Sequence, residues 1–243
     1  MKTGILVHGC NLGAFQWKRI SWGDAPELLG RLTRAILFVM EGIRDPAFEI
    51  SVMVLGTGVR AESKHKRGHS NSTEASEMRR LMFENLDRLI EFRVFADRFP
   101  ELGNADFAEQ LRSTLERITE LAEDCQNTVE EIENAAWIFR RHSIDRPILI
   151  SSPVHLPRCI KEACVLFEKG QWPEARHHLV AAPSETCYQN TTASDVAIFE
   201  PPHRPDRPMF PIQQLVKRIS RVDQSQMSDF LMDLDALLED YDA

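Results

Sequence analysis

The sequence predicts an α/β fold, a Rossmann-like three-layer sandwich with a mainly parallel sheet, plus a helical insertion and a C-terminal helical tail. Continuous apolar runs, typical of strands buried on both faces, occur at 4–9 (GILVHG), 50–58 (ISVMVLGTG) and 147–152 (PILISS). Segments with helical spacing of apolar residues alternate with these runs, which favours parallel pairing. The apolar content of 43% is enough for a sizeable core.

The remaining elements follow from periodicity and capping signals. Leucines and other apolar residues recur at helical spacing across 25–43, and Ser72-Thr73 suits the start of the next helix. Residues 118–122 can extend a helix or form a short strand. Helices are predicted at 25–43, 72–92, 127–144 and 156–170, a loop and another helix within 95–116, and a further strand at 177–184.

Two regions are predicted. Residues 1–184 form the α/β domain, with a helical insertion at about 85–116. Residues 185–243 comprise a proline-rich segment and two amphipathic helices, 212–222 and 227–243, which we expect to pack on the same domain.

Composition limits the function classes. A formal net charge of −8 argues against a nucleic-acid groove. No apolar run approaches the roughly 20 residues of a membrane helix, so we expect no membrane partner and a cytoplasmic location. The five cysteines form no Cys-x-x-Cys pair, which predicts reduced thiols and no metal cage. A homo-oligomer is left open.

Unusual polar residues and glycines gather where the predicted strands end. In parallel α/β sheets ligands bind at the carboxyl ends of the strands, so these residues predict a small-molecule site. The candidate ligand-binding residues are His8, Asn11, Gly56, Thr57, Gly58, Asn127, Thr128, Ser151 and Ser152, and the candidate catalytic residues are His155 and Arg158.

The candidate catalytic residues lie in the strand-to-helix junction that follows residue 150. His155 is the candidate acid or base, and Arg158 is the candidate anion clamp. Ser152 is interpreted as a helix cap and ligand contact. The helix begins either at Ser152 or later, near Pro157. A Ser-His hydrolase is disfavoured because no G-x-S-x-G elbow surrounds the serines.

The other candidate residues can each be explained by a structural role instead of a functional one. Thr128 and Glu131 match a capping box, which leaves Asn127 to face the cleft. The turn 56–58 either approaches a phosphate or only provides a positive φ. His8 is either a structural residue, a proton donor or a metal ligand. The basic, polar stretch 60–70 is either a lid over an anion or a solvated loop.

A resemblance to a known family rests on four motifs. NTVEEIENAAWIF (127–139) and ISSPVHLPRCIKEA (150–163) resemble the paired signature of the YdcF-like family, which also contains SanA and ElyC. VMVLGTG (52–58) and STEASEMRRLM (72–82) are similar to its strand-turn and following helix. The resemblance spans roughly residues 4–182, with Glu131-Ile132 in place of Glu-Asn and Cys159 in place of alanine.

The resemblance implies a Rossmann-like domain with a small-molecule pocket lined by Asn127, Thr128, Ser152, His155 and Arg158. It also implies S-adenosylmethionine or another nucleotide as the candidate cofactor, while the reaction stays open. The expected function is an enzyme acting on a small anionic or nucleotide-like metabolite. Two alternatives stand beside it: a non-catalytic module that binds a nucleotide or S-adenosylmethionine, and an interaction protein that uses its acidic C-terminal helix.

Overall fold

A computed structural model describes residues 1–57, 72–172 and 178–187. All of them belong to one compact unit that spans Met1–Val196. Several expectations lie outside the described residues: Gly58, the basic stretch 60–70, the two C-terminal helices and almost all of the proline-rich segment.

The core of the described part is a five-stranded sheet in which every pairing is parallel. Its order is β5-β4-β1-β6-β7. The strands are β1 (Thr3–Val7), β4 (Ile50–Gly56), β5 (Thr119–Ala122), β6 (Arg146–Ser151) and β7 (Val180–Pro183). The predicted Rossmann-like α/β class is confirmed, and the ambiguous segment at 118–122 is an edge strand paired with β4.

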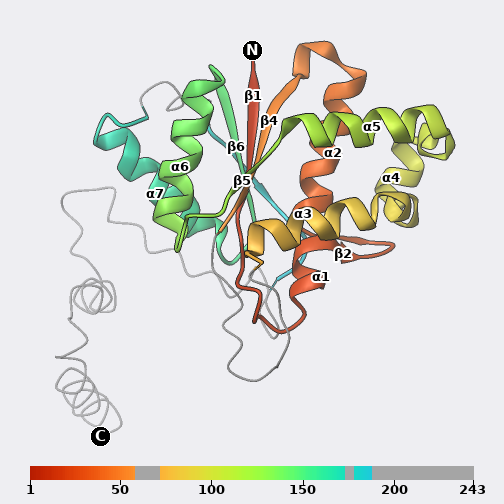
Figure 1. Ribbon diagram of the computed structural model, residues 1–243, viewed down its shortest axis with the longest axis horizontal. Helices are drawn as coiled ribbons and strands as arrows, with labels where there is room; N and C mark the ends of the chain where they lie inside the picture. The colour runs from red at the N-terminus through yellow and green to blue at the C-terminus, as the bar shows by residue number, and fades with distance from the viewer. Residues whose placement is uncertain (58–71, 173–177, 188–243) are drawn as a thin grey trace, which may run out of the picture. The chain divides into compact units, whose positions relative to one another are not determined.

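Helices cover both faces of the sheet (Figure 1). On one face, α2 (Arg31–Arg44), α3 (Glu74–Glu84) and α5 (Ala105–Ile118) bury Ile5 and Val7 of β1. On the other, α6 (Thr128–Arg141) and α7 (Leu156–Glu168) bury Leu6. Alternate residues of β1 therefore belong to two separate cores, because successive side chains along a strand point to opposite faces of the sheet. None of the described helices has the length and apolar character needed to cross a bilayer.

The helix predicted at 25–43 begins six residues late. Residues before it form a small hairpin of β2 (Gly23–Asp24) and β3 (Leu28–Leu29), preceded by α1 (Trp17–Trp22). Gly30 is the N-cap of α2, and a Cβ there would lie 2.4 Å from the backbone of Trp22. The close packing of these two turns stops the helix from extending backwards, although Leu28 and Leu29 continue its apolar pattern.

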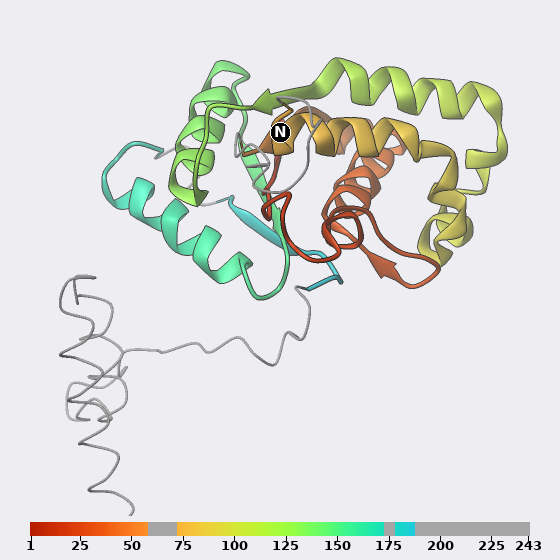
Figure 2. The ribbon, with the colours of Figure 1, turned by 60° about the horizontal axis from the view of Figure 1, so that its bottom comes forward.

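The predicted long helix 72–92 is also shorter. It ends at Glu84, where the Asn85 side chain donates to the carbonyl of Leu81 at 2.7 Å. The insertion then continues through η2 (Leu86–Glu91), α4 (Arg93–Arg98) and η3 (Pro100–Gly103) before α5; another short turn, η1 (Pro46–Phe48), precedes β4. Figure 2 shows these segments, coloured yellow to yellow-green, beside α2 and away from the green and teal α6 and α7.

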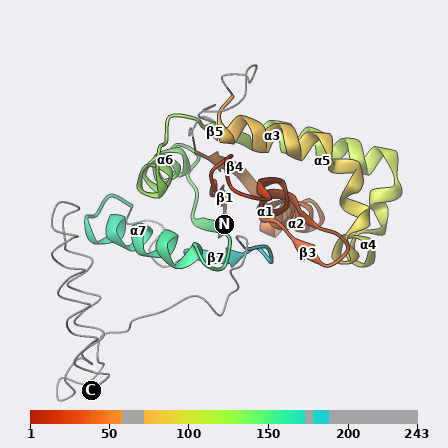
Figure 3. The same ribbon diagram turned by 90° about the horizontal axis from the view of Figure 1, so that it is seen from below.

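The connectivity creates a switch point in the sheet. From β1 the chain first builds β4 and β5 on one side and then β6 and β7 on the other. Loops that leave β1 and β6 therefore diverge to opposite faces and open a crevice at the carboxyl ends of these strands. Figure 3 looks onto this edge.

Candidate functional site

A cavity of about 240 Å³ lies at the carboxyl ends of the parallel strands. It is lined by residues from the loops after β1, β4 and β5, by the first turns of α3 and α6, and by the residue before α7. These residues are Gly9, Cys10, Asn11, Thr57, Glu74, Gln126, Asn127, Thr128, Glu131 and His155. The predicted location is thus where a cavity exists, and five of its predicted residues line it.

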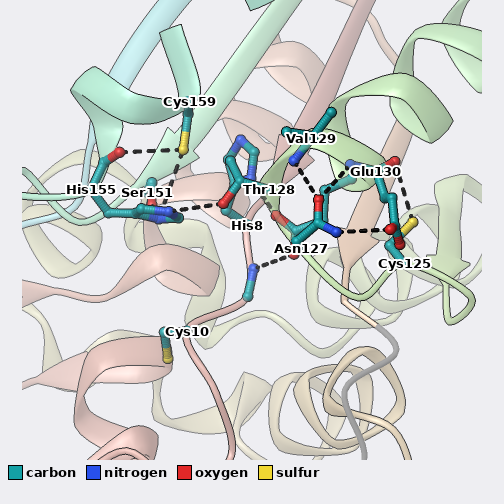
Figure 4. Close-up of polar contacts among 12 residues, drawn as sticks. His8, Cys10, Cys125, Asn127, Thr128, Val129, Glu130, Ser151, His155 and Cys159 are labelled. Atoms are coloured by element: carbon teal, nitrogen blue, oxygen red, sulfur yellow. Dashed lines mark hydrogen bonds and ion pairs between the residues drawn. The ribbon is translucent and has the colours of Figure 1, made fainter. Parts of the chain in front are cut away.

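His155 is the only histidine among the lining residues. Its ring is held from two directions: Nδ1 lies 2.9 Å from Ser151 Oγ, and Nε2 lies 3.2 Å from Thr128 Oγ1. Helix α7 begins at Leu156, so the later of the two predicted helix starts holds and His155 is the N-cap residue. Figure 4 shows the ring reaching from the end of β6 towards Thr128 on α6.

Ser152 has a different role from the predicted one. It is fully buried, and its hydroxyl accepts hydrogen bonds from Nη2 (2.9 Å) and Nε (3.2 Å) of Arg31. Arg31 is itself completely buried and also donates through Nη1 to the carbonyls of His8 and Gly9. A buried guanidinium requires such acceptors, so Ser152 serves Arg31 and neither caps α7 nor lines the cavity. No sequence pattern indicates that Arg31, at the start of an amphipathic helix, points inwards.

The predicted capping box is shifted by one residue. Asn127 is the N-cap of α6, and its Oδ1 accepts from the amides of Val129 (3.0 Å) and Glu130 (3.1 Å). Thr128 is therefore the first helical residue, and its hydroxyl reaches His155 and not the helix amides. Asn127 was expected to be free to face the cleft. Its side-chain carbonyl instead caps the helix, as asparagine at this position commonly does.

Glu131 forms part of the cavity wall and is held from behind by His8. Its Oε2 lies 2.6 Å from His8 Nδ1, and its Oε1 accepts from the amide of Gly9 at 3.2 Å. The two side chains are 3% and 0% exposed. Burial disfavours the charged imidazole, but Cys159 and Glu131 outweigh it and raise the pKa of His8 to about 9. Burial likewise disfavours the carboxylate, yet His8 holds the pKa of Glu131 below its usual range. The pair is therefore ionic, and His8 lies behind the lining.

Glu74 fixes the loop that follows β1. It is completely buried and accepts from the amides of Cys10 (2.7 Å) and Asn11 (2.9 Å) and from Trp17 Nε1 (2.7 Å). Three N–H donors satisfy the carboxylate oxygens, which a buried carboxylate needs. Sequence reasoning missed this residue because an acid in the first turn of a helix is an ordinary surface feature.

The turn after β4 is packed against Glu131 of α6. A Cβ at Gly56 would lie 2.9 Å from Glu131 Oε1, so the space that was predicted for a ligand is filled by that carboxylate. Thr57 does line the cavity, and its φ of 86° is rare for a β-branched residue. Gly58 lies outside the described residues.

Arg158 is not brought to the cavity. It is exposed on α7 and is absent from the lining residues. Helix α7 begins at Leu156, so His155 precedes the helix whereas Arg158 lies within its first turn. The role of Arg158 as an anion clamp therefore gains no support.

Three buried thiols differ in character. Burial alone raises the pKa of a thiol, and with carboxylates nearby it brings Cys10 and Cys125 to about 12. Burial acts the same way on Cys159, but His8 and His155 outweigh it and lower its pKa to about 6. Its Sγ lies 3.7 Å from Nδ1 of His155. The lowered pKa favours the thiolate form of Cys159, which does not line the cavity.

Gly9→Ala is expected to lower the free energy of unfolding by about 1–3 kcal/mol, because a new methyl group is forced into a filled site. Its Cβ would lie 2.7 Å from Thr57 Cβ and 2.8 Å from Glu74 Oε2. Urea unfolding of the two proteins measures the change. Gly103→Ala is the control, since nothing lies within 4 Å of a Cβ there. Equal stability of Gly9→Ala and the parent would contradict the tight approach.

Within the described part of the chain, no group of three or more His, Cys, Asp or Glu residues is arranged to hold a metal ion. No protein-family model, curated protein or solved structure matches the sequence. The resemblance to the YdcF-like family therefore stays a prediction, and the function must be argued from the site itself.

Proposed function

We propose that the protein is an enzyme acting on a small polar metabolite, anionic or nucleotide-like in character, with His155 as its acid or base. The observation that carries the proposal is the His155 ring, which lines the cavity with both nitrogens in polar contact. Histidine is suited to proton transfer near neutral pH because its ordinary pKa is about 6.5. A purely structural histidine has no need to border a cavity at a sheet switch point.

Nε2 is the nitrogen that exchanges a proton with the ligand. Its contact with Thr128 Oγ1 is long for a hydrogen bond, at 3.2 Å, so a ligand hydroxyl or amine can replace or share it. Ser151 Oγ, at 2.9 Å from Nδ1, holds the ring in orientation. Two contacts from different elements thus fix the ring plane before a ligand arrives, which reduces the entropy lost in reaching the transition state.

The surroundings favour negative charge on the ligand in spite of two lining carboxylates. Glu131 is paired with His8, and the oxygens of Glu74 are occupied by buried N–H donors, so neither carboxylate has a lone pair directed freely into the cavity. Thr128 opens the 14-residue helix α6, whose N-terminus carries the positive end of the helix dipole. Asn11 and Gln126, both exposed, add amide groups at the rim.

S-adenosylmethionine, the cofactor that the resemblance implies, does not fit the cavity as a whole. Ligands of its size occupy pockets of about 300 Å³ or more, whereas this cavity measures about 240 Å³. The described residues accommodate one part of such a molecule, for instance a sugar or a phosphate group. No step of the proposed chemistry depends on it.

His155→Gln is expected to reduce kcat by at least about 100-fold with an unchanged fold, the usual contribution of a general acid or base. The full-length protein is screened by thermal shift with adenosine monophosphate, S-adenosylmethionine and a hexose phosphate, and stabilising probes are assayed for turnover by mass spectrometry. His142→Gln is the control, because His142 pairs with Glu120 and lies outside the lining.

Two results would contradict this assignment. A kcat that survives in His155→Gln removes His155 from the chemistry. Saturable stabilisation by a probe that is never converted to product replaces the enzyme with a binding module.

A further inference from the structure

A chain of contacts runs behind the cavity from Glu131 to His155. Glu131 holds Nδ1 of His8 at 2.6 Å, and the other nitrogen of His8, Nε2, is buried with no hydrogen-bond partner among the described residues. The rings of His8 and His155 pack edge to face, with centroids 5.9 Å apart. Cys159 Sγ lies beside Nδ1 of His155 at 3.7 Å (Figure 4).

The charges of this chain alternate. The pKa is lowered for Glu131, raised to about 9 for His8 and lowered to about 6 for Cys159, which favours the charged form of each. Among the described residues, Arg31 of α2 brings a further charge to the cluster, because it donates to the carbonyls of His8 and Gly9. An alternating series places negative charge next to the ring that is proposed to react.

We propose that Cys159 is a positioning residue for His155: its sulfur accepts a hydrogen bond from Nδ1–H and so leaves the lone pair of Nε2 on the cavity side. The opposite tautomer would direct the Nδ1 lone pair at a thiolate, which is repulsive. Ser151 Oγ then acts as a second acceptor for the same N–H. The arrangement gives a sulfur the place that a carboxylate holds in many catalytic triads.

Cys159 itself is no nucleophile in this arrangement. It is completely buried in the core formed with α6 and does not border the cavity, so a ligand cannot reach its sulfur. In its protonated form the thiol can also donate to the carbonyl of His155, 3.4 Å from Sγ in the first turn of α7. The cysteine therefore acts through His155, and the inference rests on the proposed role of His155.

The test reads the imidazole directly and needs no substrate. Nitrogen NMR of the full-length protein labelled with ¹⁵N-histidine, with His155 assigned from its loss in His155→Gln, reports the tautomer. The parent is expected to show a protonated Nδ1 and an unprotonated Nε2 at neutral pH. Cys159→Ser is expected to show a mixture of both tautomers, because the anion is gone. Cys164→Ala, an exposed thiol on the same helix, should leave the spectrum unchanged.

A second measurement follows the thiol. Ultraviolet absorbance of the thiolate should rise with a midpoint near pH 6 in the parent and in Cys164→Ala, and this step should be missing in Cys159→Ser. Should Cys159→Ser fail to fold, the parent titration still decides, because the absence of a step near pH 6 overturns the proposal. An unchanged tautomer in a folded Cys159→Ser also overturns it. If no turnover is found, the proposed enzymatic function is refuted, but the tautomer and thiolate measurements still test the role of Cys159.

Discussion

Glu131→Gln should destabilise the protein by about 3 kcal/mol, the lower end of the range for removing one partner of a buried ion pair. The loss stays at the lower end because His8 can shed its proton once the carboxylate is gone. Glutamine has nearly the same shape, so the change isolates charge and not packing. Urea unfolding at neutral pH measures it.

The control lies on the same helix. Glu133→Gln changes an exposed carboxylate of α6 and is expected to shift the free energy of unfolding by less than about 0.5 kcal/mol. Similar losses in the two variants would mean that the Glu131 carboxylate contributes nothing beyond helix propensity.

The loss of stability in Glu131→Gln is expected to depend on pH. The pKa of His8 is raised, so the stability that its protonation contributes is fully present below about pH 6.5 and is lost as the pH rises through about 9. The difference in unfolding free energy between the parent and Glu131→Gln should therefore shrink between neutral pH and about pH 10. A difference that stays constant over this interval would show that His8 is neutral in the folded protein.

Arg31→Met is expected to lower the free energy of unfolding by about 2–4 kcal/mol. Methionine fills a similar volume but leaves the carbonyls of His8 and Gly9 without their buried donor, and each orphaned acceptor costs about 1–3 kcal/mol. The removed cost of burying a charge offsets part of this loss. Thermal and urea unfolding of the purified variant measure the total.

Arg34→Met is the matched control, one turn further along α2. Arg34 pairs with Glu185, with side chains 24% and 39% exposed, and solvent screening limits the pair to about 1 kcal/mol or less. If Arg31→Met proved as stable as the parent, hydrophobic packing would be able to replace the guanidinium, and the polar anchoring of the loop after β1 would be unnecessary for folding.

Sequence patterns were sufficient for the sheet and for a cavity at its carboxyl edge. The runs at 5–7 and 148–150 are apolar throughout, as strands covered on both faces require, and the polar residues that follow them mark the edge where the cavity lies. The first and last residues of each helix were harder to predict. A one-residue shift of the N-cap, from Thr128 to Asn127, exchanged the roles of two side chains, because cap identity depends on which residue leaves the extended region first.

The buried polar partners could not be predicted. Glu74, Glu131 and Arg31 sit in helical segments where charged residues ordinarily face solvent, and nothing in the local pattern distinguishes them. Each finds its partner more than 20 residues away along the chain, in His8, Gly9, Cys10 or Ser152. Only the three-dimensional path of β1 brings these groups together.

The position of β1 at the centre of the sheet has a dynamic consequence. Its hydrogen bonds to both neighbouring strands continue to His8, whose amide donates to the carbonyl of Ile150 at 3.0 Å. The cavity wall that His8 holds from behind therefore belongs to the part of the molecule that opens only when the whole domain unfolds. At the rim, the amide of Asn11 is held by Glu74, and Asn127 is held as the cap of α6. The cavity therefore keeps its shape before a ligand binds.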